Sequence, residues 1–259
     1  MQLRPLPALL DNYIWLLDDG TSALAVDPGV AGPLLDELSA SGLRLTTLLL
    51  THHHADHVGG VAEVLRRYPD VQVFGPRDAR IHGRVRTVGE GDRVAVESPR
   101  ITFDVLEIPG HTATHIAYLG AGMLFCGDTL FSLGCGRMFE GTPAQFQKSL
   151  ARIAALPGAT QVCCGHEYTL ANGQFAARID PHNRALAERI EAATQMRSAA
   201  QATLPSRIED ELAANPFLRG DSHAIVDALT LFHGVAPRDG VETFAWLRAM
   251  KDKFQIPAE

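Results

Sequence analysis

The sequence predicts an α/β fold in which two runs of strands form a sandwich of sheets, covered outside by helices and followed by a helical segment. Short apolar runs bounded by turn residues recur through the first part of the 259 residues and indicate strands. Segments with apolar residues at helical spacing separate these runs. After about residue 171 the chain is rich in Ala, Arg and Glu and has no strong strand signal. We therefore expect one sandwich, with loops along one rim, and then helices.

In chain order, the first predicted element is a hairpin of residues 13–17 and 23–26, followed by a short helix over 31–40 that ends at Gly42. The further predicted strands cover residues 45–50, 71–74, 84–88, 94–96, 101–108, 115–119, 123–126 and 161–164. The further predicted helices cover residues 60–68, 143–156, 183–200, 222–232 and 240–250. The helix over 143–156 should have Thr142 as its N-cap and Pro143 at its first position.

The run Thr51-His52-His53-His54-Ala55-Asp56-His57 follows the apolar stretch 43–50 and indicates a metal site at a strand end. In an extended segment, His52, His54 and Asp56 would project to one side and His53 to the other, and His57 would then need only a turn. Three other fragments place a His or an Asp after an apolar run that ends in Gly: Pro109-Gly110-His111, Cys126-Gly127-Asp128 and Cys164-Gly165-His166.

These residues divide into two predicted ligand sets. His52, His54 and His111 would supply three nitrogens to one divalent ion, and Asp56, His57 and His166 would form a second set. Asp128 has the charge and reach to bridge both, and Asp56 and Asp128 are the predicted catalytic carboxylates. Five imidazoles and two carboxylates without a thiolate suit two zinc ions best, and iron or manganese nearly as well.

Three neighbouring residues have two interpretations each. His53 fits a residue that supports the ligands or packs, rather than a ligand. His115 could face the site or only hold a strand. Asp27, in Val26-Asp27-Pro28-Gly29, could be only a turn former, or it could orient a metal-bound histidine.

Composition excludes several classes of function. The net charge of −7 argues against general nucleic-acid binding. No apolar stretch is long enough to span a bilayer, and residues 1–5 do not begin a secretory signal, so we expect a cytoplasmic protein without a membrane partner. The four cysteines have no disulfide-framework spacing and are expected to be reduced: Cys126, Cys135, Cys163 and Cys164.

The motifs T-H-H-H-A-D-H, P-G-H-T, G-D-T-L-F and C-G-H-E-Y resemble those of the metallo-β-lactamase superfamily. The chain is similar, more narrowly, to glyoxalase II, the hydroxyacylglutathione hydrolases, in residues 134–142, 164–169, 215–219 and 248–254. The resemblance implies an αββα metallo-β-lactamase-like sandwich with a C-terminal helical domain. It also implies a catalytic domain in residues 1–171, a helical substrate-binding domain in residues 172–259, and the seven ligands named above.

The same resemblance implies a glutathione-binding surface. The residues at the matching positions are Arg137, Phe139, Tyr168, Arg248 and Lys251. Arg248 and Lys251 would share one helix face, although both could instead be solvated surface charges, and Tyr168 could instead cap the core. Two departures from the family's pattern are Thr114, where a glycine is frequent, and Leu133, where a smaller residue is common. A threonine cannot adopt positive φ cheaply.

The resemblance implies hydrolysis of S-(2-hydroxyacyl)glutathione, chiefly S-D-lactoylglutathione, to glutathione and D-lactate, a step of methylglyoxal detoxification. Two cations that share a water should lower its pKa from about 15.7 toward roughly 7, so that hydroxide can attack the thioester. The expected partner is this small molecule, and the expected state is a monomer. The alternatives are a mononuclear iron persulfide dioxygenase, in which His57 and His166 would be idle, another hydrolase of this fold such as a β-lactam hydrolase, and a binding module without the chemistry.

Overall fold

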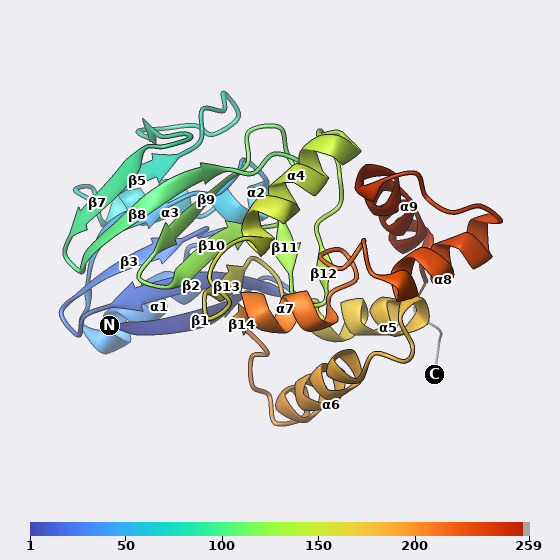
Figure 1. Cartoon of the computed structure of the whole chain (residues 1–259). Coiled ribbons are helices and arrows are strands. Elements are labelled where there is room, and N and C mark those ends of the chain that lie inside the picture. Colours follow the sequence, from blue (N-terminus) through green and yellow to red (C-terminus); the bar gives the residue numbers. More distant parts are fainter. Residues whose placement is uncertain (256–259) are drawn as a thin grey trace. The chain divides into compact units, whose positions relative to one another are not determined.

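The N-terminal strands form a six-stranded sheet in the order β1-β2-β3-β4-β5-β6 (Figure 1). Its strands are β1 (Gln2–Ala8), β2 (Asn12–Asp18), β3 (Ser22–Val26), β4 (Arg44–Leu49), β5 (Gln72–Gly75) and β6 (Arg86–Thr87). Strands β1 to β3 pair antiparallel, whereas β3 to β6 pair parallel. The apolar strands β2 and β3 are buried along their whole length, as is typical of strands inside a covered sheet.

Strand β1 was not predicted, because Pro5 and Pro7 interrupt its apolar pattern. It nevertheless pairs with β2 from Gln2 opposite Asp18 to Ala8 opposite Asn12. It lies at the edge of the sheet, which is where a strand that contains proline is tolerated.

A second sheet contains β7, β8, β9 and β10 in antiparallel order, with the end of β13 beside β10. The bounds are β7 (Arg93–Glu97), β8 (Arg100–Glu107), β9 (Ile116–Gly120), β10 (Met123–Gly127) and β13 (Gln161–Cys164). The two sheets meet through buried aromatic rings, because the Trp15 ring lies 6.4 Å from that of Phe125. The Tyr118 hydroxyl also donates to the Leu50 carbonyl at 3.0 Å. The predicted sandwich is therefore confirmed.

Helices α1 (Gly32–Ser41) and α3 (Val61–Arg67) pack on the first sheet. Leu34 and Leu38 of α1 and Val61 and Val64 of α3 are buried in one cluster with the apolar side chains of β2 to β5. Helix α1 ends at Gly42, which has a φ of 70° and caps the helix as predicted. The short helix α2 (Ala55–Val58) precedes α3.

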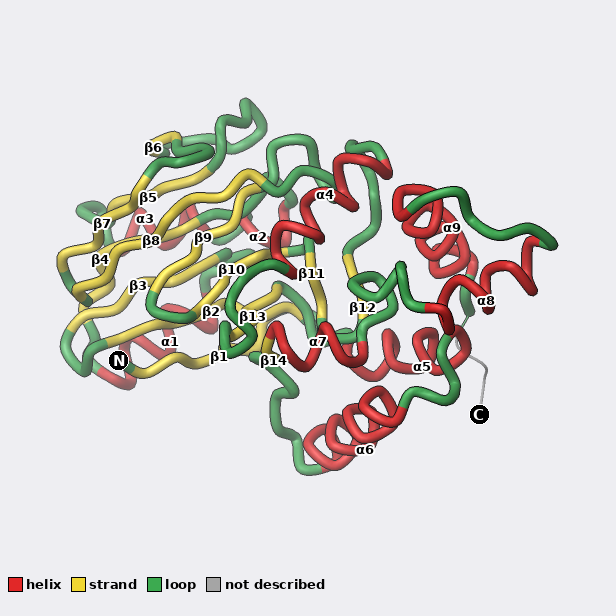
Figure 2. The backbone as a smooth tube through the Cα atoms, viewed as in Figure 1, coloured by secondary structure: helices red, strands yellow, loops and turns green. Residues whose placement is uncertain are grey.

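The described residues, 1–255, form two compact units. The first unit comprises Met1–Glu107, Thr114–Gly127 and Cys163–Glu167. The second contains Ile108–Ala113, Asp128–Val162 and, of the described residues, those from Tyr168 to Gln255. Figure 2 shows strands in yellow and helices in red, and the helices predominate after residue 168. The predicted domain boundary at residue 171 stays a prediction.

The second unit contains most of the helices. They are α4 (Pro143–Ala154), α5 (Thr169–Ile179), α6 (Arg184–Ser198), α7 (Ile208–Ala214), α8 (His223–His233) and α9 (Gly240–Lys253). Thr142 caps α4 with Gln145 in a reciprocal capping box, which confirms the predicted start. The second unit also contains the short strands β11 (Leu130–Phe131), β12 (Gly134–Cys135) and β14 (Ser206–Arg207). Strand β11 pairs with β12, and β14 pairs with the beginning of β13. Two-residue strands carry too little periodicity to be predicted.

Candidate metal centre

The histidine run leaves the end of β4 without regular structure from Leu50 to His54, and α2 begins at Ala55. His54 is extended, with φ −60° and ψ 142°. Asp56, by contrast, lies in the single turn of α2 together with His57. The prediction that Asp56 continues an extended alternation is therefore wrong, since the chain turns at Ala55, two residues earlier than expected.

Asp56 and His57 of α2 meet His166, which follows β13, in a group that we call the donor triplet. The two Nε2 atoms of His57 and His166 lie 3.4 Å apart. Asp56 Oδ2 lies 3.6 Å from His57 Nε2 and 3.4 Å from His166 Nε2. Ligand distances of about 2.0–2.1 Å around a tetrahedral zinc ion would place neighbouring donor atoms roughly 3.3–3.4 Å apart. The donor triplet therefore fits a divalent ion.

The other predicted ligands form two pairs with similar spacing. In the first unit, His52 Nε2 lies 3.1 Å from His54 Nδ1. In the second unit, His111 Nε2 lies 3.4 Å from Asp128 Oδ2, and both side chains are buried. The first unit thus holds five of the seven predicted ligands and the second holds two.

Asp27 orients one histidine of the donor triplet, which supports the second of its two interpretations. Its Oδ2 atom lies 3.0 Å from His57 Nδ1 and accepts a hydrogen bond from Thr51 Oγ1 at 2.6 Å. A carboxylate at Nδ1 keeps the proton on that nitrogen, so that Nε2 presents a lone pair to the other donors. Gly29 follows in the same loop, and a Cβ there would lie 1.8 Å from the Asp56 carbonyl oxygen. Glycine therefore allows this loop to approach α2.

His53 and His115 lie beside the ligands and have other contacts. His53 Nδ1 is 3.4 Å from Asp78 Oδ2, and the neighbouring Arg80 guanidinium is the main reason that the pKa of Asp78 is lowered. His115 is fully buried and stacks on the His52 ring with 4.6 Å between centroids. His115 therefore packs beneath a predicted ligand. The Thr114 hydroxyl donates to Asp78 at 2.6 Å. Thr114 does not have a positive φ, so its backbone does not require the glycine that is frequent at this position in the family.

Of the predicted substrate contacts, Arg137 and Phe139 lie next to His111 within the second unit. The Arg137 carbonyl oxygen is 2.8 Å from His111 Nδ1, and the largely exposed Phe139 ring lies 5.3 Å from the His111 ring. In the same loop, a Cβ on Gly136 would lie 1.9 Å from the Asp128 carbonyl oxygen. Leu133 is buried with a φ of 59°, so this departure from the family's pattern occurs at a left-handed position.

Arg248 and Lys251 lie on α9 and contact backbone carbonyls of the second unit. Arg248 is only 4% exposed, and its Nη1 donates to the Cys135 carbonyl at 2.9 Å. The alternative of a solvated surface charge is therefore wrong for Arg248. Lys251 Nζ donates to the Ala171 carbonyl at 3.1 Å. Burial, together with the nearby Arg248, lowers the pKa of Lys251 to about 8. The Tyr168 ring packs edge-on against Phe131 at 5.2 Å.

Sequence reasoning missed two residues of the first unit that contact the donor triplet. Asp11 Oδ1 lies 2.7 Å from His166 Nδ1. Asn12 Nδ2 donates to Asp56 Oδ2 at 3.1 Å. Asp11 is the last residue of the turn between β1 and β2, and Asn12 begins β2, so both are far from the histidine run in the sequence. Only the polar pair Asp11-Asn12 at a strand start could have drawn attention to them.

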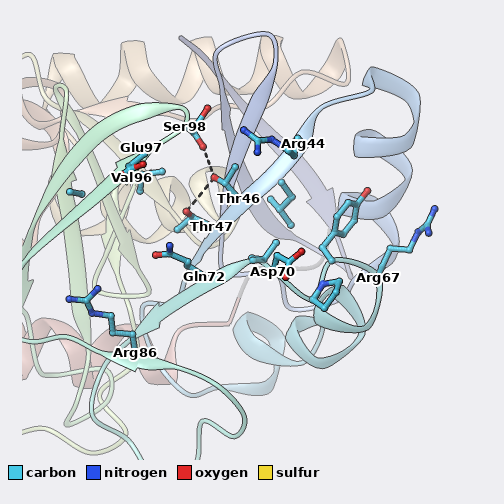
Figure 3. A pocket seen from close by; sticks show the side chains of 15 residues that line it. Arg44, Thr46, Thr47, Arg67, Asp70, Gln72, Arg86, Val96, Glu97 and Ser98 are labelled. Carbon is cyan, nitrogen blue, oxygen red and sulfur yellow. Dashed lines mark hydrogen bonds between the residues drawn. The ribbon is translucent and has the colours of Figure 1, made fainter.

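A polar cavity of about 740 Å³ opens elsewhere in the first unit (Figure 3). Its lining includes the first residues of β4 and β5, such as Arg44, Thr46 and Gln72, and Glu97 of β7. Thr46 Oγ1 donates to the Ser98 carbonyl at 2.5 Å within it. The predicted ligands follow the other end of β4, so this cavity is separate from the candidate metal centre.

The family model described as Metallo-beta-lactamase superfamily matches residues 8–166, and the model described as Hydroxyacylglutathione hydrolase C-terminus matches residues 167–254. A hydroxyacylglutathione hydrolase of Xanthomonas campestris pv. campestris (strain B100) is 51% identical, over 98% of this chain and 100% of its own. The chain belongs to the hydroxyacylglutathione hydrolase family. A member from Xylella fastidiosa (strain M23) is also 51% identical, over 99% of this chain and 98% of its own.

Solved structures agree with the metallo-beta-lactamase fold of this family. ETHE1 from Myxococcus xanthus has a TM-score of 0.64 and 27% identity, covering 97% of this chain and 100% of its own. TTHA1623, solved in a di-iron-bound form, has a TM-score of 0.55 and 29% identity, covering 64% of this chain and 92% of its own. The predicted αββα class and its C-terminal helical region are thus confirmed. Among residues 1–255, no helix is long and apolar enough to cross a membrane.

Proposed function

We propose that this chain hydrolyses the thioester of S-(2-hydroxyacyl)glutathione, chiefly S-D-lactoylglutathione, to glutathione and D-lactate. The observation that carries this proposal is the match of the hydroxyacylglutathione hydrolase family along both parts of the chain. The match over residues 8–166 includes all seven predicted ligands, and that over residues 167–254 includes Arg248 and Lys251. The reaction would serve methylglyoxal detoxification in the cytoplasm, and the protein would act as a monomer.

We further propose that the seven predicted ligands serve one binuclear centre. His52, His54 and His111 would hold one divalent ion, and the donor triplet would hold the other. Asp128 would contact both ions. A donor set of imidazoles and carboxylates suits zinc, and iron or manganese would also fit. When bound, two such cations make hydroxide available at neutral pH and stabilise the negative charge that develops on the thioester oxygen.

The chain's own residues hold the reacting groups in place. Asp27 fixes the His57 ring through Nδ1, which keeps Nε2 directed at the other donors. A carboxylate oxygen of Asp56 can also accept a hydrogen bond from the attacking hydroxide and so orient it. The leaving group is a thiolate, and a thiol with a pKa of about 8.5 departs without a strong general acid. The mechanism therefore needs neither a serine nor a cysteine nucleophile.

Glutathione recognition falls to the second unit in this proposal. The two carboxylates of the tripeptide need cations, and the candidates are the exposed Arg137 and the half-buried Lys251. Arg248 is buried and would act mainly by holding the carbonyls of Cys135 and Gly136. Phe139 offers an exposed ring beside His111, and Tyr168 would line the same surface. Residues 1–171 would form the catalytic domain and residues 172–259 the substrate-binding domain.

The test is hydrolysis of S-D-lactoylglutathione by protein whose metal content has been measured. We expect two divalent ions per chain and thioester cleavage that disappears when a chelator removes them. One iron per chain, with oxygen uptake and no thioester cleavage, would identify a persulfide dioxygenase instead. Metal-loaded protein that cleaves no acyl-glutathione would indicate a binding module.

A further inference from the structure

We propose that Asp11, the last residue of the turn between β1 and β2, and Asn12, the first residue of β2, are positioning residues for the donor triplet. Asp11 would fix the ring of His166, and Asn12 would fix the carboxylate of Asp56. This inference rests on the proposed function only in that the triplet must bind a metal ion. Every contact that supports it lies within the first unit.

The backbone of the turn is paired with the ligand segment on both sides of His166. The Glu167 amide donates to the Asp11 carbonyl at 2.8 Å, and the Tyr13 amide donates to the Gly165 carbonyl at 2.8 Å. Asn12 and His166 face each other as an isolated antiparallel bridge. The start of β2 therefore fixes the position and direction of the loop that follows β13.

The side chain of Asp11 then sets the ring of His166. Its Oδ1 atom lies 2.7 Å from His166 Nδ1, a short charge-assisted contact. An imidazole that donates from Nδ1 to a carboxylate has its lone pair on Nε2. His166 Nε2 is the atom that faces His57 Nε2 at 3.4 Å and Asp56 Oδ2 at 3.4 Å. Asp27 does the same for His57 through Nδ1 at 3.0 Å.

With neutral imidazoles, Asp27 and Asp11 thus direct the Nε2 lone pairs of His57 and His166 at each other. The His166 lone pair also faces the Asp56 carboxylate oxygen. Such a group of acceptors is repulsive unless a cation lies among them. Asp11 therefore favours the His166 tautomer whose Nε2 atom can ligate a metal ion. The three donor atoms lie 3.4–3.6 Å apart, which is the spacing that fits a divalent ion.

Asn12 acts on the remaining member of the triplet. Its Nδ2 atom donates to Asp56 Oδ2 at 3.1 Å and to the Asp56 backbone carbonyl at 3.2 Å. Asn12 is only 7% exposed, so these bonds form away from bulk water. A neutral amide can hold a carboxylate in one orientation without cancelling its charge, whereas a lysine or an arginine would compete with the metal ion. Asn12 therefore fits a residue that orients Asp56 and leaves its charge to the ion.

The first test measures zinc binding by the whole chain, by titration against a chromophoric chelator. In Asp11→Ala we expect one of the two ions to bind about 10–100-fold more weakly, the loss typical for removing the partner of a ligating histidine. Asp11→Asn keeps an oxygen that can accept from His166 Nδ1, so its loss should be smaller. Asp36→Ala, at an exposed carboxylate of α1, should bind both ions as the unchanged chain does.

A second pair of variants separates positioning from general loosening of the turn. Asn12→Asp keeps the size of the side chain but places a carboxylate oxygen against two acceptors of Asp56, so it should weaken zinc binding more than Asn12→Ala. Tyr13→Phe removes the 2.8 Å hydrogen bond from the Tyr13 hydroxyl to Glu167 in the same turn. This hydrogen bond joins no member of the triplet, so its loss should leave zinc affinity unchanged.

The outcomes distinguish this inference from the proposed function. If the unchanged chain binds no more than one ion, the binuclear function fails. If it binds two ions and Asp11→Ala binds both with the same affinity, only the positioning role is wrong. Equal weakening in Asp11→Ala and Tyr13→Phe would also overturn it, because the turn would then matter only for packing. If Asp11→Ala does not fold, Asp11→Asn and Asn12→Asp decide by the same criteria.

Discussion

The two units support their predicted ligands in different ways. In the first unit, His57 and His166 each have a carboxylate at Nδ1, from Asp27 and Asp11. In the second unit, His111 has the neutral carbonyl oxygen of Arg137 at the same ring position, 2.8 Å away. A carboxylate partner makes an imidazole a stronger ligand than a carbonyl partner does. The donor triplet should therefore hold its ion more tightly than the ligands that depend on His111.

The largest effect is expected from removing a ligand of the donor triplet. His166→Ala should lose one ion and lower kcat by at least about 10²–10³-fold, the loss typical for one contact that stabilises an oxyanion. Metal analysis and steady-state kinetics check this together. His53→Ala is the matched control, because His53 belongs to the same histidine-rich run but contacts Asp78. An equal loss in both variants would contradict the assignment.

The next largest effect should follow from changing a carboxylate partner. Asp27→Asn leaves every ligand in place but weakens the acceptor at His57 Nδ1, and we expect about 10–100-fold weaker binding of one ion. Chelator competition measures it. Asp104→Asn, at an exposed carboxylate of β8 paired with Arg93, should have no effect on metal affinity. If Asp27→Asn bound both ions with unchanged affinity, a carboxylate partner would not make a histidine a stronger ligand here, and the expected difference in affinity between the two units would be wrong.

A smaller effect is expected at the remote substrate contact. Lys251→Met keeps an apolar side chain but removes the charge, which lies 5.4 Å from the centroid of the Phe175 ring, so KM should rise by roughly 10-fold with a smaller change in kcat. Lys253→Met, at an exposed lysine of the same helix, is the control. Arg248 is less suitable for this test, since its loss would also release the Cys135 carbonyl. An unchanged KM in Lys251→Met would exclude the residue from the glutathione site.

The smallest effect concerns pH. Burial lowers the pKa of Lys251 from 10.5 to about 8, so its charge is present below pH 8 and lost above it. KM should rise a few-fold as the pH passes 8, and Lys251→Met should not show this rise. Between pH 8 and 10.5 the unfolded chain binds more protons at this residue, so its contribution to stability increases with pH. A KM that is flat across this range in the unchanged chain would contradict the role of Lys251.

The sequence predicted the parts whose signals are local. The apolar runs predicted β4, β8 and β10, and the histidine run that follows β4 predicted a metal site. The Asp11 and His166 contact joins residues 155 positions apart, and no pattern near either residue indicates it. Asp27 was ambiguous because Val-Asp-Pro-Gly is also a turn sequence. Strand β1 was missed because its prolines hide an edge strand, and the turn of α2 was too short to interrupt the expected alternation.

The most direct test of the binuclear centre is anomalous scattering from crystals of the zinc-loaded chain. We expect two peaks about 3.5–4 Å apart, one of them within about 2.0–2.2 Å of His57 Nε2, His166 Nε2 and a carboxylate oxygen of Asp56. The second peak should lie beside His52 and His54. A single peak, or a pair of peaks that leaves the donor triplet without an ion, would contradict the account.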